Sequence, residues 1–308
     1  MTRRRATVAL ITGAEGQLGR ELQATAPAGW RVRACGSAEL DVTRPESVAE
    51  ALGREPPDVI LNAAAYTAVD AAEREAERAE AVNAAGAGHV AEAARRVGAR
   101  LVHVSTDFVF DGAQGRPYGP EDRPRPLNVY GRTKLAGERE VLRICADRAV
   151  VVRTAWLYAS HGRNFPRTML RLMREREHVD VVADQVGTPT WARALAEALW
   201  GVAARPALGG IQHWTEAGVA SWYDFAVAVQ EEALALGLLD RAVPVRPLRS
   251  EEYPAPARRP PYSVLDKSAT WSALGRPAGH WRASLRLMLR ELATTPAPAN
   301  ARGPARRG

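Results

Sequence analysis

The chain has 308 residues, of which 46% are hydrophobic and 25% are charged, and this composition is typical of a globular protein. Its apolar runs are shorter than the ~18 residues of a membrane span, so we expect no membrane segment. The formal net charge is +7, but the arginines lie among acidic neighbours, as in AEREAERAEAV (72–82), which argues against nucleic-acid binding. Two cysteines, Cys35 and Cys145, are too few for a disulfide framework or a metal cluster.

The first half of the chain alternates short apolar runs with helical stretches, as βαβ units do. The apolar run after the basic start MTRRR leads into a glycine loop rather than a cleavage site, so we expect a strand there and a cytoplasmic protein. The runs are nearly continuous in apolar residues, which is typical of a parallel sheet covered on both faces. The sequence therefore predicts an α/β fold with a doubly wound, Rossmann-like parallel sheet. Strands are predicted over TVALIT (7–12), WRVRAC (30–35), DVILNAAA (58–65), ARLVHVSTD (99–107) and AVVVRTAWLY (149–158), with helices from Gln17, near Pro45, near Ala72 and around Tyr130.

Beyond about residue 155 the pattern loosens into prolines, tryptophans and single helices, such as 193–203 and 221–236. We predict a nucleotide-binding domain over 1–155, to which some later segments return, and a smaller C-terminal α/β substrate lobe over 156–293. The basic, low-complexity stretch 294–308 is predicted to be a disordered tail.

Three glycines stand between the first strand and its helix, in TGAEGQLG (12–19). Gly13, Gly16 and Gly19 permit a tight turn and close backbone approach, so a pyrophosphate can sit at the helix N-terminus. An acidic residue after the second strand would bind the adenosine ribose of NAD, but none stands at 35–37. We therefore expect both NADH and NADPH to serve, with Asp41 and Val42 on the adenine side.

Two further segments end predicted strands, where ligands bind in open parallel sheets. NAAAYTAVD (62–70) follows the third strand with three alanines, which either let a flat cofactor lie close to the sheet edge or pack a neighbouring helix. VSTDFVFDG (104–112) ends the fourth strand with Ser105, Thr106 and Asp107, and a hydroxyl there can hydrogen-bond a reacting carbonyl.

Tyr130 and Lys134 lie one helical turn apart in PLNVYGRTKLAGE (126–138). Only Lys134 and Lys267 are lysines among the 42 Lys and Arg residues, so a lysine at this place is notable. A nearby ammonium is expected to lower the pKa of the Tyr130 phenol, which could then donate a proton to a carbonyl oxygen. An ordinary surface pair is the alternative explanation of an isolated YxxxK.

Together these motifs resemble the extended short-chain dehydrogenases/reductases and, within them, the dTDP-4-dehydrorhamnose reductase family. The resemblance covers residues 7 to 293. It depends most on the later motifs, namely STDFVFDG, NVYGRTKLAGE, VVRTAWLY, NFPRTMLRL, VVADQVGTPT, SWYDFA and PAPARRPPYSVLD.

The resemblance implies reduction of the C4 ketone of dTDP-4-dehydro-6-deoxy-L-mannose to dTDP-L-rhamnose by NADPH or NADH. It implies a catalytic set of Thr106, Tyr130 and Lys134, with Lys134 also holding the nicotinamide ribose. The implied cofactor contacts, which add to Tyr130 and Lys134, are Gly13, Gly16, Gln17, Leu18, Gly19, Asp41, Val42, Ala64, Ala65, Tyr66, Thr67 and Val104. The implied contacts to the dTDP-sugar are Thr106, Asp107, Phe108, Trp156, Asn164 and Arg259.

The sequence departs from the family pattern at three places. Phe108 replaces a usual tyrosine and Tyr262 a usual asparagine. Some members dimerise through magnesium held by carboxylates, but here Arg193 stands where an acid is expected beside Glu21 and Glu291, so we expect no metal. The assembly stays open between a monomer and a homodimer.

Two alternative functions remain open at this stage. One is a related dTDP-4-keto-6-deoxyhexose reductase of a secondary-metabolite sugar pathway, which Phe108 leaves open. The other is a non-catalytic, NADP-binding regulatory subunit, against which the intact catalytic set argues.

Overall fold

The computed structural model describes residues 5–294, so the predicted tail lies outside the described residues except for Thr294. Its centre is a six-stranded sheet in which every neighbouring pair is parallel. The spatial order is β2-β1-β3-β4-β5-β10. The strands are β1 (Thr7–Thr12), β2 (Trp30–Cys35), β3 (Val59–Asn62), β4 (Arg100–Thr106), β5 (Ala149–Thr154) and β10 (Gly210–His213).

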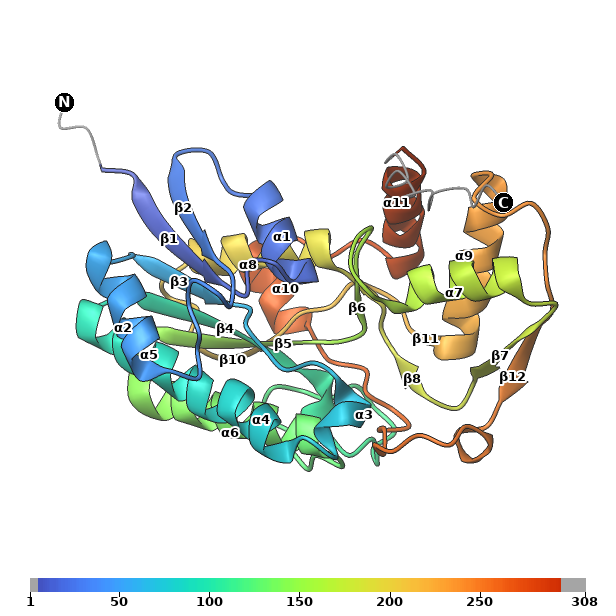
Figure 1. Cartoon of the computed structure of the whole chain (residues 1–308), viewed down its shortest axis with the longest axis horizontal. Helices are drawn as coiled ribbons and strands as arrows, with labels where there is room; N and C mark the ends of the chain where they lie inside the picture. Colours follow the sequence, from blue (N-terminus) through green and yellow to red (C-terminus); the bar gives the residue numbers. More distant parts are fainter. Residues whose placement is uncertain (1–4, 295–308) are drawn as a thin grey trace, which may run out of the picture.

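Helices cover both faces of this sheet, as the continuous apolar strands predict (Figure 1). One face packs on α2 (Pro45–Arg54), α5 (Gly86–Val97) and α6 (Val129–Cys145). The other packs on α1 (Gln17–Ala24) and α8 (Ala192–Ala203), with α10 (Ser268–Leu274) beside α8. Adjacent strand residues point to opposite cores, as Ile60 and Leu61 show. The predicted Rossmann-like fold is confirmed.

The structure corrects two predicted elements and adds a sixth strand to the sheet. The fifth strand ends at Thr154, because the backbone turns at Trp156, and β6 (Leu157–Tyr158) pairs with β9 (Thr190–Trp191) outside the main sheet. The sixth strand, β10, was not expected from its sequence. The single helix expected near Ala72 is divided into short elements. These are α3 (Val69–Ala72), α4 (Ala76–Glu80) and a π-helical segment, η1 (Ala81–Ala85), which continues into α5.

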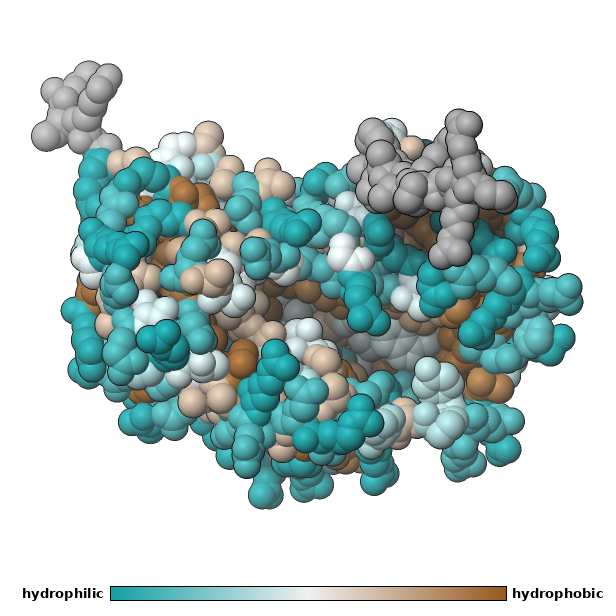
Figure 2. Space-filling model, viewed as in Figure 1, coloured by the Kyte–Doolittle hydropathy of each residue, from teal (hydrophilic) through white to brown (hydrophobic). Residues whose placement is uncertain are grey.

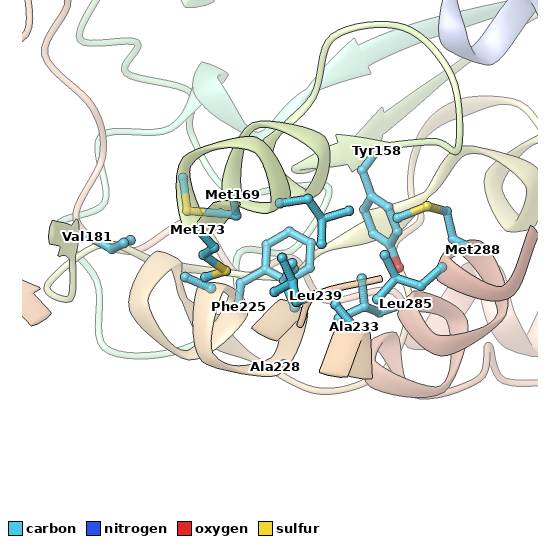
Figure 3. Close-up of a cluster of buried hydrophobic side chains, with 14 of the residues drawn as sticks. Tyr158, Met169, Met173, Val181, Phe225, Ala228, Ala233, Leu239, Leu285 and Met288 are labelled. Carbon is cyan, nitrogen blue, oxygen red and sulfur yellow. The ribbon is translucent and has the colours of Figure 1, made fainter. Parts of the chain in front are cut away.

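The C-terminal part forms a second, smaller α/β unit around its own core. Its helices are α7 (Phe165–Glu175), α9 (Trp222–Ala235) and α11 (Trp281–Thr294). Short strand pairs complete it: β7 (Val179–Val182) with β12 (Val245–Leu248), and β8 (Val186–Gly187) with β11 (Ala220–Ser221). Figure 3 shows Phe225 of α9 between Met169 and Met173 of α7 on one side and Leu285 of α11 on the other.

The face seen in Figure 2 is hollowed between these two parts of the molecule. Parallel strands of an open sheet present their carboxyl ends to one edge, and ligands bind there where the strand order reverses. In this sheet the reversal falls between β1 and β3. Among residues 5–294, no helix combines the length and apolar character needed to cross a membrane.

Candidate active site

The glycine turn between β1 and α1 is shaped for close backbone approach. Gly13 has φ +66°, and a Cβ there would lie 2.8 Å from the Ala64 nitrogen. A Cβ at Gly19 would lie 2.2 Å from the Gly13 oxygen. Gly16 caps α1 without any side-chain hydrogen bond, which leaves the first N–H groups of the helix to other acceptors. The turn therefore fits a pyrophosphate.

Gln17 and Leu18, two predicted cofactor residues on α1, differ in the direction of their side chains. The Gln17 side chain donates to the Arg163 carbonyl oxygen at 3.3 Å and accepts from Asn164 Nδ2 at 2.8 Å. Leu18 points into the core, so only its backbone can contact a ligand. Asn164 also caps α7, and its amide donates to two further carbonyl oxygens. These bonds engage both ends of the Asn164 side chain, which was predicted to contact the sugar nucleotide.

Acidic side chains do reach the end of β2, although none stands at 35–37 in the sequence. Glu39 accepts a hydrogen bond from the Gly36 N–H at 2.8 Å. A Cβ at Gly36 would lie 2.9 Å from the Glu15 carboxyl carbon. Glu15 belongs to the glycine turn, so the fold supplies an acid that the local sequence of β2 does not show.

Asp41 and Val42, predicted for the adenine side, follow β2. The Asp41 carboxylate accepts hydrogen bonds from the Thr43 hydroxyl and the Thr43 N–H, and these bonds lower its pKa. The Val42 side chain is buried in the core, and its carbonyl oxygen lies 2.9 Å from His89 Nδ1. Of these two residues, only Asp41 has a partly exposed side chain.

The alanine segment after β3 is fixed to helix α6 by Asn83, which sequence reasoning missed. Buried Asn83 accepts from the Tyr66 N–H at 2.9 Å and donates to the Tyr66 carbonyl oxygen at 3.1 Å. It also donates to Thr133 Oγ1 at 3.1 Å, and Thr133 donates to the Tyr130 carbonyl oxygen. The segment that includes Ala64, Ala65 and Thr67 is thereby tied to α6. The π-helical turn that carries Asn83 has no simple sequence signature.

The end of β4 brings Thr106 and Asp107 to the sheet edge, both buried. The Thr106 hydroxyl donates to Asp107 Oδ1 at 3.1 Å and accepts from the Phe108 N–H at 3.2 Å. Burial raises the pKa of Asp107 to about 6, although hydrogen bonds from Ser263 and Thr106 oppose this. Asp107 is therefore ionised at neutral pH and holds the Thr106 side chain.

Tyr130 lies on the first turn of α6, against Phe108. The two rings meet edge to face with centroids 5.7 Å apart. Gly131 permits this approach, because a Cβ there would lie 2.2 Å from the Phe108 carbonyl oxygen. The expected lowering of the Tyr130 pKa is wrong for this arrangement: burial raises it to about 12, and a hydrogen bond with Thr106 opposes the rise only in part. The phenol is protonated and can act as a proton donor.

Lys134 points to the backbone of β4, which explains why it does not lower the pKa of Tyr130. Its ammonium donates to the Val104 carbonyl oxygen at 2.7 Å, and its side chain is buried. Burial lowers the pKa of Lys134 to about 8, and the negative charge of Glu138 opposes the change. Glu138 in turn forms a buried ion pair with Arg153 at 2.7 Å.

The remaining predicted substrate residues lie on segments that follow the main sheet. Trp156 lies two residues after the end of β5 and is partly exposed. Arg259 forms an ion pair with Asp70 at 2.7 Å, which ties the PAPARRPP segment to the start of α3. Phe108 is partly exposed beside Tyr130, so Thr106, Phe108 and Tyr130 form one cluster.

The residues that could hold magnesium do not fit a metal. Arg193 Nε lies 3.0 Å from Glu21 Oε2, and its Nη1 lies 3.2 Å from Glu291 Oε2. His161 Nε2 lies 3.0 Å from the other Glu21 oxygen. A guanidinium between the two carboxylates neutralises the charge that a hard cation requires. Within the described chain, no group of three His, Cys, Asp or Glu residues could hold a metal ion.

Three features define the class of protein to which this chain belongs. They are a parallel sheet covered on both faces, a glycine turn after its first strand, and a Tyr/Lys pair one turn apart on α6. The chain has the architecture of the extended short-chain dehydrogenases/reductases.

The comparisons with known proteins narrow this class. The family model described as "RmlD substrate binding domain" matches residues 7–294. A dTDP-4-dehydrorhamnose reductase of Burkholderia thailandensis is 43% identical over 92% of this chain and 98% of that protein. One from Mycobacterium tuberculosis is 45% identical over 94% of this chain and 93% of that protein. A crystal structure of a Bacillus anthracis dTDP-4-dehydrorhamnose reductase in complex with NADP matches with a TM-score of 0.87 and 36% identity, over 92% of this chain and 99% of that chain. The chain belongs to the dTDP-4-dehydrorhamnose reductase family.

Proposed function

We propose that this protein reduces the C4 ketone of dTDP-4-dehydro-6-deoxy-L-mannose to dTDP-L-rhamnose with NADPH or NADH. The observation that carries the proposal is the protonated Tyr130 phenol beside Thr106, on a helix tied through Asn83 to the segment after β3. Relatives named for this activity match over almost their whole length. We expect such an enzyme to work in the cytoplasm.

The glycine turn and the segment after β3 are the parts of the chain that would hold the dinucleotide. Gly13 and Gly19 let the turn pack closely against the chain's own backbone, and the N–H groups at the N-terminus of α1 could then bind a pyrophosphate. Tyr66 and Thr67 follow the alanines. The solved relative from Bacillus anthracis contains NADP. When bound, a reduced nicotinamide supplies the hydride that adds to C4 of the sugar.

The residues of this chain then complete the reduction by supplying a proton. The Tyr130 phenol donates its proton to the ketone oxygen as the carbon receives the hydride, so the ketone becomes an alcohol. The Thr106 hydroxyl can hydrogen-bond the same oxygen after it rotates away from Asp107. The Lys134 ammonium, which donates to the Val104 carbonyl oxygen, holds Tyr130 of α6 against the strand that carries Thr106.

A related 4-ketoreductase acting on another deoxysugar is the second candidate. Phe108 favours it, because the apolar ring packs against Tyr130 where the family usually has a hydroxyl. The regulatory-subunit alternative has less support, because Thr106, Tyr130 and Lys134 lie together and are buried or partly buried.

The deciding experiment supplies enzymatically prepared dTDP-4-dehydro-6-deoxy-L-mannose with NADPH and identifies the product sugar by NMR. We expect dTDP-L-rhamnose, formed at the rate at which NADPH is consumed. Absence of turnover by the folded wild type would overturn the assignment. Turnover only of a different 4-keto-6-deoxysugar would support the second candidate.

A further inference from the structure

Glu138 is a buried acidic residue of helix α6 that has no part in the proposed reaction. It follows Lys134 by four positions, so the two side chains lie one helical turn apart on the side of α6 that faces the sheet. Lys134 is 2% exposed and Glu138 is 1% exposed. Two opposite charges are therefore neighbours in a part of the molecule from which water is excluded.

Arg153 of β5 fixes the Glu138 carboxylate. Its Nε donates to Glu138 Oε1 at 2.9 Å, and its Nη2 donates to Oε2 at 2.7 Å. The Arg153 side chain is itself fully buried, with its guanidinium 5.1 Å from the centre of the Phe110 ring. Because a guanidinium keeps its proton at any working pH, Glu138 is held as a carboxylate with both oxygens bound.

Two histidines lie close to these charges, and both are neutral. Burial and the charge of Lys134 lower the pKa of His103, on β4, well below its usual value. Burial and the charge of Arg153 lower the pKa of His213, on β10, to about 3. At neutral pH neither ring adds a charge to the surroundings of Lys134.

Two further carboxylates near α6 bind groups other than the Lys134 ammonium. Asp107 faces Tyr130, where burial and the Asp107 charge together raise the pKa of the phenol. Glu73 accepts a hydrogen bond from a backbone N–H at the start of α6 at 2.8 Å. Glu138 differs from both. Burial lowers the pKa of Lys134, and the negative charge of Glu138 opposes that change.

We propose that Glu138 is a positioning residue whose buried negative charge keeps Lys134 in its ammonium form, bound to the Val104 carbonyl oxygen. A hydrogen bond from a charged donor is stronger than one from a neutral amine, so the charge of Glu138 strengthens the bond between α6 and β4. The inference rests on the proposed function, in which α6 carries the proton donor Tyr130. Glu138 acts through Lys134 and has no part in hydride or proton transfer.

The experiment follows the ionisation of Lys134 directly by NMR. Lys134 and Lys267 are the only lysines of the chain, so protein labelled with lysine that carries carbon-13 at Cε gives two side-chain signals. The Lys267→Arg variant identifies the Lys134 signal. In the wild type this signal should titrate with a midpoint near pH 8.

Two substitutions separate the charge of Glu138 from its shape. Glu138→Gln keeps the size of the side chain and removes the charge, so the Lys134 midpoint should fall by about one pH unit. Glu138→Asp keeps the charge on a shorter side chain, so the midpoint should stay closer to wild type. A merely structural role would give the opposite order. The alkaline limb of kcat/KM should move with the NMR midpoint in both variants.

A double variant and a control complete the test. Glu138→Gln leaves Arg153 charged and unpaired, whereas Glu138→Gln/Arg153→Met removes both charges and should fold, and its Lys134 midpoint should also fall. Glu232→Gln is the matched control. Glu232 is 5% exposed and accepts from Arg286 at 2.6 Å and 2.8 Å, between α9 and α11. That variant should leave the Lys134 midpoint unchanged.

Three results would overturn the inference. They are an unchanged Lys134 midpoint in the double variant, an equal change in Glu138→Gln and Glu138→Asp, and a fall of similar size in Glu232→Gln. A folded wild type whose Lys134 signal responds to these variants as expected, but which does not reduce the sugar, would instead remove the proposed function.

Discussion

Lys134 binds the Val104 carbonyl oxygen at 2.7 Å and so fixes helix α6 to the strand that carries Thr106. This bond turns the Lys134 ammonium toward the backbone of β4. The residue that accepts it, Val104, lies two positions before Thr106. An arginine could keep the charge, but its planar guanidinium would not fit as a single donor at this buried position. The contact gives a physical reason for a lysine in a chain that has only two lysines among its 42 Lys and Arg residues.

The Tyr130→Phe variant should lose the proton donor and keep the cofactor site. We expect the rate to fall by about 10²–10⁴, the usual contribution of a general acid. The affinity for NADPH should stay close to wild type, because the glycine turn and the Asn83-fixed segment are unchanged. Stopped-flow kinetics and fluorescence titration of NADPH measure the two quantities. A variant as active as wild type would contradict the role of Tyr130.

The pH profile of kcat/KM should be bell-shaped, with limbs near pH 6 and pH 8. Burial raises the pKa of Asp107 to about 6, so below that pH the carboxylate that holds Thr106 takes up a proton. Burial lowers the pKa of Lys134 to about 8, so above that pH its positive charge is lost. Tyr130, with a pKa of about 12, stays protonated throughout.

Two variants assign these limbs. Asp107→Asn should flatten the acidic limb. Lys134→Arg should be slow but should lack the alkaline limb, because a guanidinium stays charged. An alkaline limb that persists in Lys134→Arg would show that another group titrates.

Cofactor preference should be small in the wild type and should depend on Glu15. A carboxylate beside Gly36 disfavours a 2′-phosphate, so Glu15→Gln should raise kcat/KM for NADPH several-fold and change that for NADH little. Steady-state kinetics with both cofactors test this. A wild-type preference above about a hundredfold, roughly 2.7 kcal/mol, would be inconsistent with use of both cofactors.

Phe108→Tyr restores the hydroxyl that the family usually has at this position. The ring should keep its edge contact with Tyr130, so the melting temperature should change little. We expect kcat/KM for dTDP-4-dehydro-6-deoxy-L-mannose to rise or to stay within about threefold of wild type. A loss of kcat/KM above tenfold would contradict this prediction. It would indicate that the site is shaped for another sugar.

Assembly should not depend on magnesium, because Arg193 already bridges Glu21 and Glu291. EDTA should leave the elution volume on a sizing column unchanged. The matched variant Arg193→Glu brings three carboxylates together, so it should be less stable than wild type and should be stabilised by added MgCl2. A wild-type dimer that dissociates in EDTA would refute this prediction.

The sequence predicts the parts of the site that depend on local chemistry. The strand that ends at Thr12, the glycine turn and the helix with Tyr130 and Lys134 are all found as expected, because each has a periodic or turn signal. The break after Thr154 was not predicted. The residues that follow it are apolar and continue the strand pattern, and only the packing of Trp156 against Gly187 shows why the chain turns there.

Contacts between distant segments explain the other differences. Glu15 reaches Gly36 across the sheet edge, and Asn83 reaches Tyr66 from a π-helical turn, so neither is visible in a local motif. The predicted lowering of the Tyr130 pKa is wrong for the same reason. Helical spacing places Lys134 near Tyr130, but the position of the ammonium is decided by the Val104 carbonyl on another strand.

The Asn83 amide also determines which parts of the enzyme can move during a catalytic cycle. One side chain joins the backbone at Tyr66 to Thr133, and Thr133 joins the backbone at Tyr130. The loop that would lie along the dinucleotide and the helix that carries the acid are therefore mechanically one piece. A change that loosens the backbone at Tyr66 is therefore expected to disturb the start of α6 as well.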